Sequence, residues 1–223
     1  MTILCIETST SVCSAAICKD GEPINQCICR EGSNHARLLP RYIEELLSFA
    51  REHDLSIEAV ALSEGPGSYT GLRIGTSTAK GLCYGLDIPL IPVPTLEILC
   101  ESARQQGAKG HLCPLIDARR MEVYTTDTEG KARAVVVENE ASLYDGGEDV
   151  YYFGDGATKC QKVLTQPNWH YIPDIVPQAQ YMGVLAEQAI TGDQQVSGQQ
   201  LAYYEPYYLK EFIAAQSHVK GLV

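Results

Sequence analysis

The sequence has little positive charge. Seventeen Lys and Arg residues face 28 Asp and Glu residues, which gives a net charge of −11 over 223 residues. The deficit is spread evenly, with −5 over residues 1–105 and −6 over residues 106–223. Proteins that bind nucleic acid alone neutralise phosphates with basic surfaces, and anionic membranes attract the same kind of surface. The sequence therefore predicts no membrane partner, and any RNA partner would have to be bound largely by another protein.

Signals for export and membrane insertion are also missing. No run of 18 apolar residues occurs, and the N-terminal segment has no basic region before it reaches Glu7. A spanning helix needs about 20 apolar residues, and a secretory signal begins with a basic segment. The sequence therefore predicts a cytoplasmic protein.

Paired cysteine motifs are absent, although cysteine is plentiful. The nine cysteines include no Cys-x-x-Cys pair, and the closest spacing is Cys27-x-Cys29. Zinc sites use paired ligands, whereas a free cysteine in an apolar run behaves as a small hydrophobic residue. We expect buried, reduced thiols and no structural zinc.

The familiar catalytic and cofactor motifs are lacking as well. Gly67–Gly71 has Tyr69 at the position where a Gly-x-Ser-x-Gly elbow carries its serine, and no two histidines lie three or four residues apart. The glycine-rich loop Gly65–Gly75 lacks the Gly-Lys-Ser/Thr ending of a phosphate-binding P-loop and the glycine spacing of a dinucleotide site. The residues alone therefore indicate no catalytic, cofactor-binding or metal-ligating residue.

The first half of the chain reads as a regular series of elements. Hydrophobic patterning predicts strands at 3–8, 12–18, 24–29, 57–63 and 88–93, and helices at about 34–53, 70–86 and 94–105, with Asn34 as an N-cap. Three strands followed by alternating helices and strands are typical of an α/β domain with a mixed sheet.

The second half is less regular. Strands are predicted at 112–117, 122–126, 134–138 and 150–153, one helix at 178–191, and an amphipathic tail at 203–212 that docks on the body. The segment Gln105–Gly110 is a candidate boundary. We therefore expect two lobes, residues 1–105 and 106–223.

Small residues recur along the helix predicted at 70–86. Gly71, Gly75 and Ala79 are four residues apart and share one face, and each glycine in a helix costs about 1 kcal/mol relative to alanine. Another backbone should therefore come close, from the sheet, from a helix of this chain or from another subunit. Helix 34–53 also carries a wide apolar stripe.

These two helices form our predicted interface. An exposed apolar patch of this size favours association, so we expect a homodimer when the chain is alone. The residues of the predicted interface are His35, Leu39, Tyr42, Ile43, Leu46, Gly71, Arg73, Ile74, Gly75, Thr78, Ala79 and Leu82.

Three other features allow two interpretations each. Arg119 and Arg120 beside Asp117 form either a solvated turn or a contact to a partner or to tRNA. The segment Phe153–Ala157 is either a turn or the remnant of a nucleotide loop. Arg73 and Lys80 could pair with acids on helix 34–53 or across an interface.

Several segments together resemble one known family, TsaB (YeaZ). The resemblance covers essentially the whole chain, is strongest over residues 1–100 and is looser from about 128 to 200. It implies an actin-like ATPase (ASKHA, RNase H-like) fold of two small lobes with mixed sheets. The segments that carry it are Ile3–Thr10, His35–Pro40, Gly65–Gly75, Ala79–Leu82, Ile88–Leu90, Asp117–Tyr124 and Pro206–Lys210.

The resemblance also implies a function. Members of this family serve the formation of N6-threonylcarbamoyladenosine (t6A) at position 37 of tRNAs that read codons beginning with adenine. The TsaD subunit transfers the threonylcarbamoyl group, helped by TsaB and by the ATPase TsaE. The resemblance thus implies a partner of a TsaD-like catalytic subunit and a TsaE-like ATPase, with tRNA reached indirectly through the complex.

Departures from the catalytic relative indicate a non-catalytic subunit. Thr95 and Leu99 stand where that relative has a His-x-x-x-His metal motif, and neither side chain replaces imidazole as a ligand. Glu7 stands where ASKHA ATPases usually have aspartate. The alternative is a stand-alone ASKHA-type enzyme, either an ATP-dependent kinase or a glycoprotease-like metallopeptidase, which would require nucleotide or metal.

Overall fold

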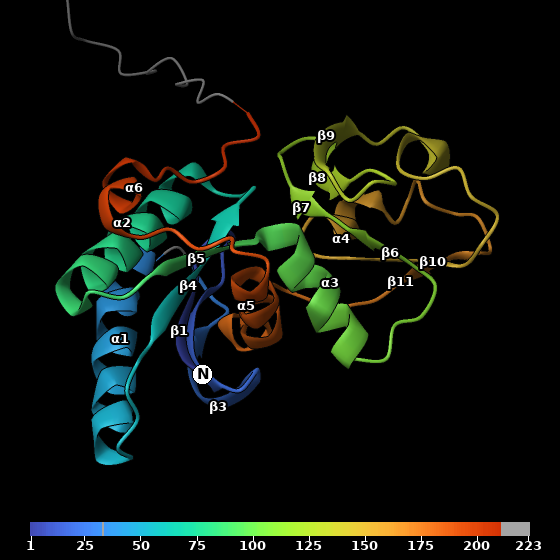
Figure 1. Cartoon of the computed structure of the whole chain (residues 1–223). Helices are drawn as coiled ribbons and strands as arrows, with labels where there is room; N and C mark the ends of the chain where they lie inside the picture. Colours follow the sequence, from blue (N-terminus) through green and yellow to red (C-terminus); the bar gives the residue numbers. More distant parts are fainter. Residues whose placement is uncertain (33, 211–223) are drawn as a thin grey trace, which may run out of the picture.

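The computed structural model describes residues 1–32 and 34–210, which form two lobes (Figure 1). The first lobe is built on a five-stranded sheet in the order β3-β2-β1-β4-β5. The strands β1, β2 and β3 are antiparallel neighbours, and β4 and β5 run parallel to β1, so the predicted mixed sheet is confirmed. The strands are β1 Thr2–Glu7, β2 Cys13–Lys19, β3 Glu22–Cys29, β4 Ala59–Gly65 and β5 Leu90–Pro94.

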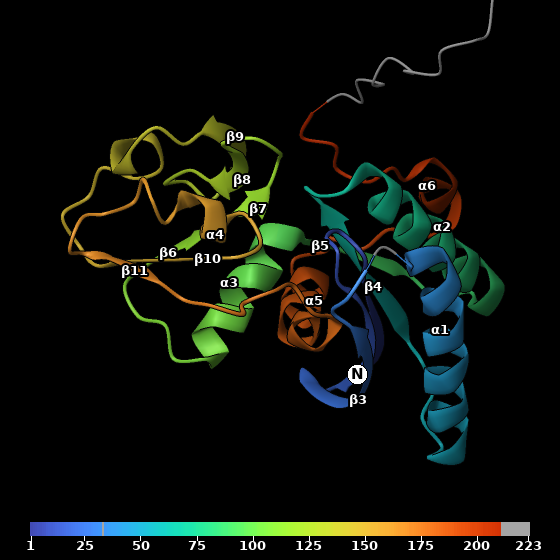
Figure 2. The ribbon, with the colours of Figure 1, turned by 180° about the vertical axis from the view of Figure 1, so that it is seen from behind.

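Helices cover both faces of this sheet (Figures 1 and 2). Helices α1 (His35–Glu52) and α2 (Tyr69–Leu86) pack on the face to which Leu4 and Ile6 point. Helices α3 (Thr95–Gln105) and α5 (Met182–Thr191) pack on the opposite face. Because both faces are buried, Ile3 to Ile6 of β1 form a continuous apolar run rather than an alternating pattern.

The start of α1 differs in detail from the prediction. Asn34 precedes the helix, but its side chain makes no capping hydrogen bond. The backbone carbonyl of Asn34 instead accepts bonds from the N–H groups of Arg37 and Leu38, at 3.0 and 2.9 Å. The first turn is also fixed by His35, whose Nε2 lies 3.1 Å from the carbonyl oxygen of Val12.

The second lobe contains two three-stranded sheets, β11-β10-β6 and β7-β8-β9. The predicted strand 112–117 is divided between them, because Leu115 bonds by its N–H to Phe153 and by its carbonyl to Gly156, after which the chain pairs with β8. The strands are β6 His111–Pro114, β7 Ile116–Asp117, β8 Glu122–Thr126, β9 Ala132–Val136, β10 Val150–Phe153 and β11 Trp169–Tyr171.

Several short elements were not predicted. They are β11, the 3-10 turn η1 Glu140–Ser142, and the helices α4 Ala157–Cys160 and α6 Gly198–Tyr203, whereas the helix predicted at 178–191 is divided into the 3-10 turn η2 Ala179–Tyr181 and α5. Each is too short to show a hydrophobic period, so tertiary contacts decide it.

After the second lobe, the chain returns to the first. Met182 and Ala186 of α5 pack with Ile3 and Ile91 of the first sheet, although the boundary at residue 105 had assigned this helix to the second lobe. Helix α6 then lies against α2, where Lys80 Nζ donates to the carbonyls of Ala202 and Tyr204, at 2.8 and 3.0 Å.

Residues 204–210, which we call the strap, then cross from the first lobe to the second. Tyr207 N–H donates to the carbonyl of Glu64 at the end of β4, at 2.7 Å, and Lys210 Nζ lies 2.5 Å from Glu122 Oε2 on β8. The C-terminal segment thus contacts both lobes up to Lys210. The last two residues of the predicted tail, Glu211 and Phe212, lie outside the described residues.

Helix α3 contacts both lobes. Ile98 lies in the core of the first lobe, whereas Leu99 packs with Ile116 and Phe153 of the second. All nine cysteines are free thiols, and only Cys29 is partly exposed. No helix within residues 1–32 and 34–210 is long and apolar enough to cross a bilayer.

Candidate functional site

The first part of the site is the turn that follows β1. Glu7, Thr8 and Ser9 are fully buried. One carboxylate oxygen of Glu7, Oε1, accepts bonds from the N–H and the hydroxyl of Ser9, at 2.5 and 2.6 Å. The other oxygen has no hydrogen-bond partner among the described residues.

The amino-terminal end of α2 closes over this turn. A Cβ atom added to Gly67, Gly71 or Gly75 would collide with Ser9 or Thr8. Thr8 Oγ1 donates to the carbonyl of Gly71, at 2.9 Å. Of the three explanations for the glycine face, the structure therefore supports close packing inside the chain at Gly71 and Gly75.

Burial dominates the electrostatics of Glu7. It raises the pKa of the carboxyl group, hydrogen bonding from Ser63 and from Ser9 acts in the opposite direction, and the charge of Asp155 in the second lobe makes a smaller contribution that raises the pKa. The pKa of Asp155 is also raised, mainly by partial desolvation and further by the charge of Asp117, although its side chain keeps an exposed surface. Two acidic groups of high proton affinity thus lie where the lobes meet.

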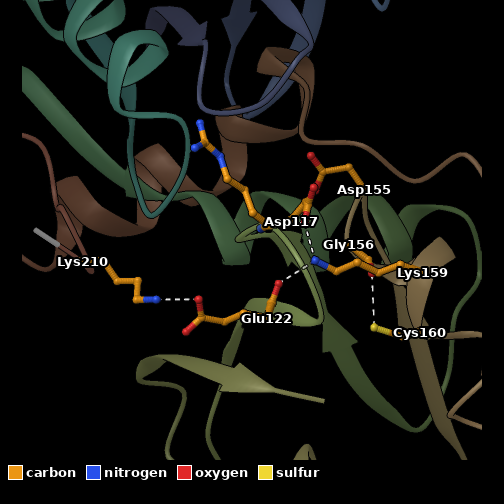
Figure 3. Close-up of polar contacts among 8 residues, drawn as sticks. Asp117, Glu122, Asp155, Gly156, Lys159, Cys160 and Lys210 are labelled. Carbon is orange, nitrogen blue, oxygen red and sulfur yellow. Dashed lines mark hydrogen bonds and ion pairs between the residues drawn. The ribbon is translucent and has the colours of Figure 1, made fainter. Parts of the chain in front are cut away.

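On the second lobe, a network of ion pairs surrounds the β7–β8 hairpin (Figure 3). Lys159 pairs with Asp117 and donates to the carbonyl of Glu122, at 2.6 Å from that oxygen. The side chain of Glu122 pairs in turn with Lys210 of the strap. Asp155 Oδ1 accepts a bond from the N–H of Asp117, at 2.9 Å, which ties the two acidic residues together.

The segment Phe153–Ala157 is a close-packed turn. A Cβ on Gly154 would collide with the carbonyl of Leu115, and one on Gly156 would lie 2.9 Å from the carbonyl carbon of Ile116. Gly154 also has a φ of +105°, which favours glycine. These glycines serve the close approach of two segments of this chain, which explains them without a ligand.

The positions of the relative's metal motif do not fit a metal here. Thr95 and Leu99 are fully buried, the hydroxyl of Thr95 lies 2.8 Å from that of Ser63, and Leu99 packs in the core between the lobes. Across the described part of the chain, no group of three or more His, Cys, Asp and Glu side chains is placed to hold a metal.

The residues of the predicted interface fall into two sets. Seven are buried in the first lobe and cannot themselves contact another chain: His35, Leu39, Ile43, Leu46, Gly71, Gly75 and Ala79. Five are half-buried or exposed: Tyr42, Arg73, Ile74, Thr78 and Leu82. The interface stays a prediction, and only the second set can line it.

The outer surface of α2 carries two further glycines. Gly81 and Gly85 are exposed, and nothing lies within 4 Å of a Cβ built on either residue. Packing inside the chain therefore does not explain why these positions lack a side chain. Half-buried Leu82 and strongly exposed Tyr84 lie beside them on the helix.

The cations of α2 have other partners than predicted. Lys80 binds the two carbonyls at the end of α6 rather than an acid on α1. Arg73 lies over the ring of Tyr69, 4.2 Å from its centroid, and donates to the hydroxyl of Tyr208, at 3.3 Å. Sequence reasoning missed Lys159, Tyr208 and Lys210 as members of the site, since their partners are 37 to 135 residues away.

The two lobes, the sheet order and the buried turn after β1 define a class of protein, the actin-like ATPase (ASKHA) fold. A structure from Pseudomonas aeruginosa, titled as having similarity to peptidase YEAZ, superposes with a TM-score of 0.78 and 25% identity, covering 94% of this chain and 99% of that one. A second, titled YeaZ from Pseudomonas aeruginosa, gives 0.75 and 28%.

Sequence comparison gives the family. The profile of the family described as "TsaD: tRNA N6-adenosine threonylcarbamoyltransferase" matches residues 31–145. The proteins named "tRNA threonylcarbamoyladenosine biosynthesis protein TsaB" are 35% identical over 124 residues in Haemophilus influenzae and 37% over 126 residues in Bacillus subtilis. The chain belongs to this family, and within it to the TsaB (YeaZ) group. The match covers 56% of this chain and about half of each relative, 52% and 54%.

Proposed function

We propose that this protein is a non-catalytic subunit needed for t6A formation at position 37 of tRNAs that read codons beginning with adenine. It pairs with a TsaD-like transferase, acts together with a TsaE-like ATPase, and forms a homodimer when alone. Membership of the TsaB group carries the proposal, since proteins of that name are described as serving threonylcarbamoyladenosine biosynthesis.

Two features of the chain support a non-catalytic role. The positions of the relative's metal motif are occupied by Thr95 and Leu99, whose side chains are used in packing. The glycines of the loop 153–157 are used to bring two segments of the second lobe together. In this chain, the positions that match the relative's metal motif and the loop that most resembles a nucleotide loop are therefore both used in packing.

The outer surface of α2 supports the pairing. Gly81 and Gly85 leave the backbone open beside half-buried Ile74, Thr78 and Leu82, and exposed helical glycines cost about 1 kcal/mol each. A second helix that packed there would gain close backbone contact and cover the apolar side chains. With Tyr42 of α1, these residues define the proposed partner surface.

The test is Gly81→Leu in a reconstituted reaction with the TsaD-like and TsaE-like proteins. Leucine favours helix, so the melting temperature should stay the same or rise. Co-elution with the TsaD-like protein and t6A formation should both fall at least tenfold, because the added side chain blocks backbone approach.

The matched control is Gln188→Leu, which adds an exposed leucine to helix α5 away from α2. It should leave pairing and modification unchanged. If Gly81→Leu pairs normally, the partner surface is wrong. If the reaction proceeds equally well without this subunit, the proposed function is wrong.

The alternative, a stand-alone kinase or metallopeptidase, makes a different prediction. Calorimetry with ATP–Mg²⁺ and metal analysis of the purified chain should show no stoichiometric binding under our proposal. Tight binding of either would favour the enzyme.

A further inference from the structure

The turn between β7 and β8 places two arginines in an unfavourable backbone conformation. Arg119 and Arg120 have φ angles of +73° and +52°, in the left-handed region where glycine and asparagine are common. The turn is held by bonds from Ala118 N–H to Glu122 and from Glu122 N–H to Arg119, both at 3.1 Å. Such a conformation costs about 1–2 kcal/mol per residue, so the turn itself does not explain the two arginines.

The charges around this turn leave the two arginines uncompensated. Asp117 is paired with Lys159, and Glu122 is paired with Lys210, while Asp155, which accepts a bond from Asp117 N–H, is a further acid beside the hairpin. Both arginines are exposed, and within the described residues neither guanidinium group takes part in an ion pair. In a chain of net charge −11, the tip of this hairpin is locally positive.

Aromatic rings and further cations lead from α2 to the hairpin. The rings of Tyr69 and Tyr208 are 4.8 Å apart, and Arg73 lies over Tyr69. Two residues further along the strap, Lys210 reaches Glu122 at the base of the hairpin. We call Tyr69, Arg73, Tyr208, Lys210, Arg119 and Arg120 the cationic strip.

We infer that the cationic strip binds RNA directly, with Arg119 and Arg120 contacting backbone phosphates of a single-stranded loop. This inference rests on the proposed function, which brings tRNA to the complex, and it replaces our expectation that tRNA is reached only through the partner. Guanidinium groups bind phosphate by paired hydrogen bonds. Tyrosine rings provide stacking surfaces for unpaired bases, and alternation of the two is typical of surfaces that bind unpaired RNA.

An acidic protein surface is a weaker candidate for the same strip. It would pair with the guanidinium groups but would leave the tyrosine rings beside them unused. RNA would contact both the guanidinium groups and the tyrosine rings. Because the rest of the chain is acidic, contact with RNA would be limited to the edge that carries the positive tip. We therefore argue for RNA and keep the protein surface as an outcome of the test.

The experiment measures binding of an unmodified tRNA transcript to the complex of the full chain with its TsaD-like partner, at several KCl concentrations. We compare the wild type with the double variant Arg119→Gln/Arg120→Gln. Each single-strand phosphate contact contributes about 0.7 to the slope of log K against log [salt], so the slope should fall by about 1.4. The affinity near 0.1 M salt should fall about tenfold or more.

Three further variants separate charge from fold. Arg119→Lys/Arg120→Lys keeps the charges and should keep most of the slope. Arg119→Gly/Arg120→Gly relieves the backbone and should lose the slope without lowering the melting temperature. Arg104→Gln removes an exposed arginine on α3 that bonds to Glu97 and Glu101, and it should leave RNA binding unchanged.

The outcomes decide between the interpretations. An unchanged slope in both charge-removing variants overturns the inference, even if the complex still modifies tRNA, and the proposed function then stands. Weaker pairing with the TsaD-like protein at an unchanged RNA slope identifies a protein contact and also overturns it. A wild-type complex that makes no t6A contradicts the proposed function, whatever the slope.

Discussion

At the scale of single residues, the glycines of α2 divide into two kinds by what lies opposite them. Gly71 and Gly75 face Thr8 of the same chain, whereas Gly81 and Gly85 face open space. The first kind is required by the fold. The second kind leaves a surface open to another molecule, and simple substitutions distinguish the two.

Gly75→Ala should destabilise the protein and Gly81→Ala should not. The new methyl group at residue 75 collides with Thr8 Oγ1, and such overpacking costs about 1–3 kcal/mol. The methyl group at residue 81 meets nothing and improves helix propensity by up to about 1 kcal/mol. Urea unfolding of both variants checks the opposite signs, and equal effects would contradict this division of the helix.

Glu7 should make stability depend on pH. Because burial raises its pKa in the folded state, the protonated form is favoured there, and its stabilising contribution is present below the unfolded pKa and lost as pH rises through the folded pKa. Glu7→Gln is neutral at every pH, while its amide oxygen can still accept from Ser9. The variant should therefore gain stability relative to the wild type as pH rises from about 4.5 towards neutrality.

Urea unfolding at a series of pH values measures this difference in free energy. Glu138→Gln, a change at an exposed carboxylate of the second lobe, serves as the control because it leaves the buried turn untouched. A difference for Glu7→Gln that stays constant or shrinks with rising pH would show that Glu7 is not held in the environment described.

At the scale of elements, strand register decides which thiols can be joined. Cys13 of β2 lies directly opposite Cys29 of β3, whereas Cys5 of β1 lies opposite Ala16 and Cys18 opposite Ile3. Opposite residues of antiparallel strands have Cα atoms about 4.5–5.5 Å apart, and diagonal ones about 7–8 Å. Only the first distance suits a disulfide, although the sulfur atoms of Cys5 and Cys18 are 3.7 Å apart.

Oxidised glutathione should therefore link Cys13 to Cys29 before any other pair. Cys29 is the partly exposed thiol and reacts first, releasing one glutathione; the sulfur of Cys13 then attacks that of Cys29 and releases the second. Burial raises the pKa of Cys13 to about 12, so the second step should be slow at neutral pH. Mass spectrometry of peptides from the native, thiol-blocked protein identifies the linked pair, and Cys29→Ser is the control. Earlier linkage of Cys5 to Cys18 would contradict the register.

At the scale of the whole molecule, α3 and the C-terminal return join the two lobes. One side of α3 belongs to the core of the first lobe and the other to the core of the second, and the strap crosses between them. A chain with shared cores of this kind should unfold as one unit rather than lobe by lobe.

Leu99→Ala should lower the stability of both lobes together. Leu99 is fully buried between Ile116 and Phe153, and such truncations cost about 2–5 kcal/mol. Trp169, the single tryptophan, reports on the second lobe, and far-ultraviolet circular dichroism reports on the helices of the first. In wild type and variant alike, the two signals should change at the same urea concentration. An earlier fluorescence transition would show that the second lobe unfolds separately.

The sequence by itself determined the elements of the first lobe from β1 to α3, although not the return of α5 and α6 to it. Strands β1, β2, β4 and β5 are largely apolar runs and the helices are amphipathic segments, so local pattern and tertiary environment agree over most of Thr2 to Gln105. The elements of the second lobe were harder to predict from the sequence, since β7, β11 and α4 have two to four residues and depend on neighbours distant in sequence. The family was also visible in the sequence, because its motifs are turns and glycines that the backbone itself requires.

Only the tertiary structure decided how the glycines of α2 are used and where the charges meet. Sequence spacing predicts the same close backbone approach for every glycine on a helix face. In the structure, the turn at Thr8 lies close to Gly71 and Gly75 but not to Gly81 or Gly85. In the same way, the sequence left Arg119 and Arg120 as either a solvated turn or a contact to a partner or to tRNA, and only the structure shows that Lys159 and Lys210 pair with Asp117 and Glu122 beside them. A contact between residues far apart in the chain depends on the packing of whole elements, which local sequence pattern does not encode.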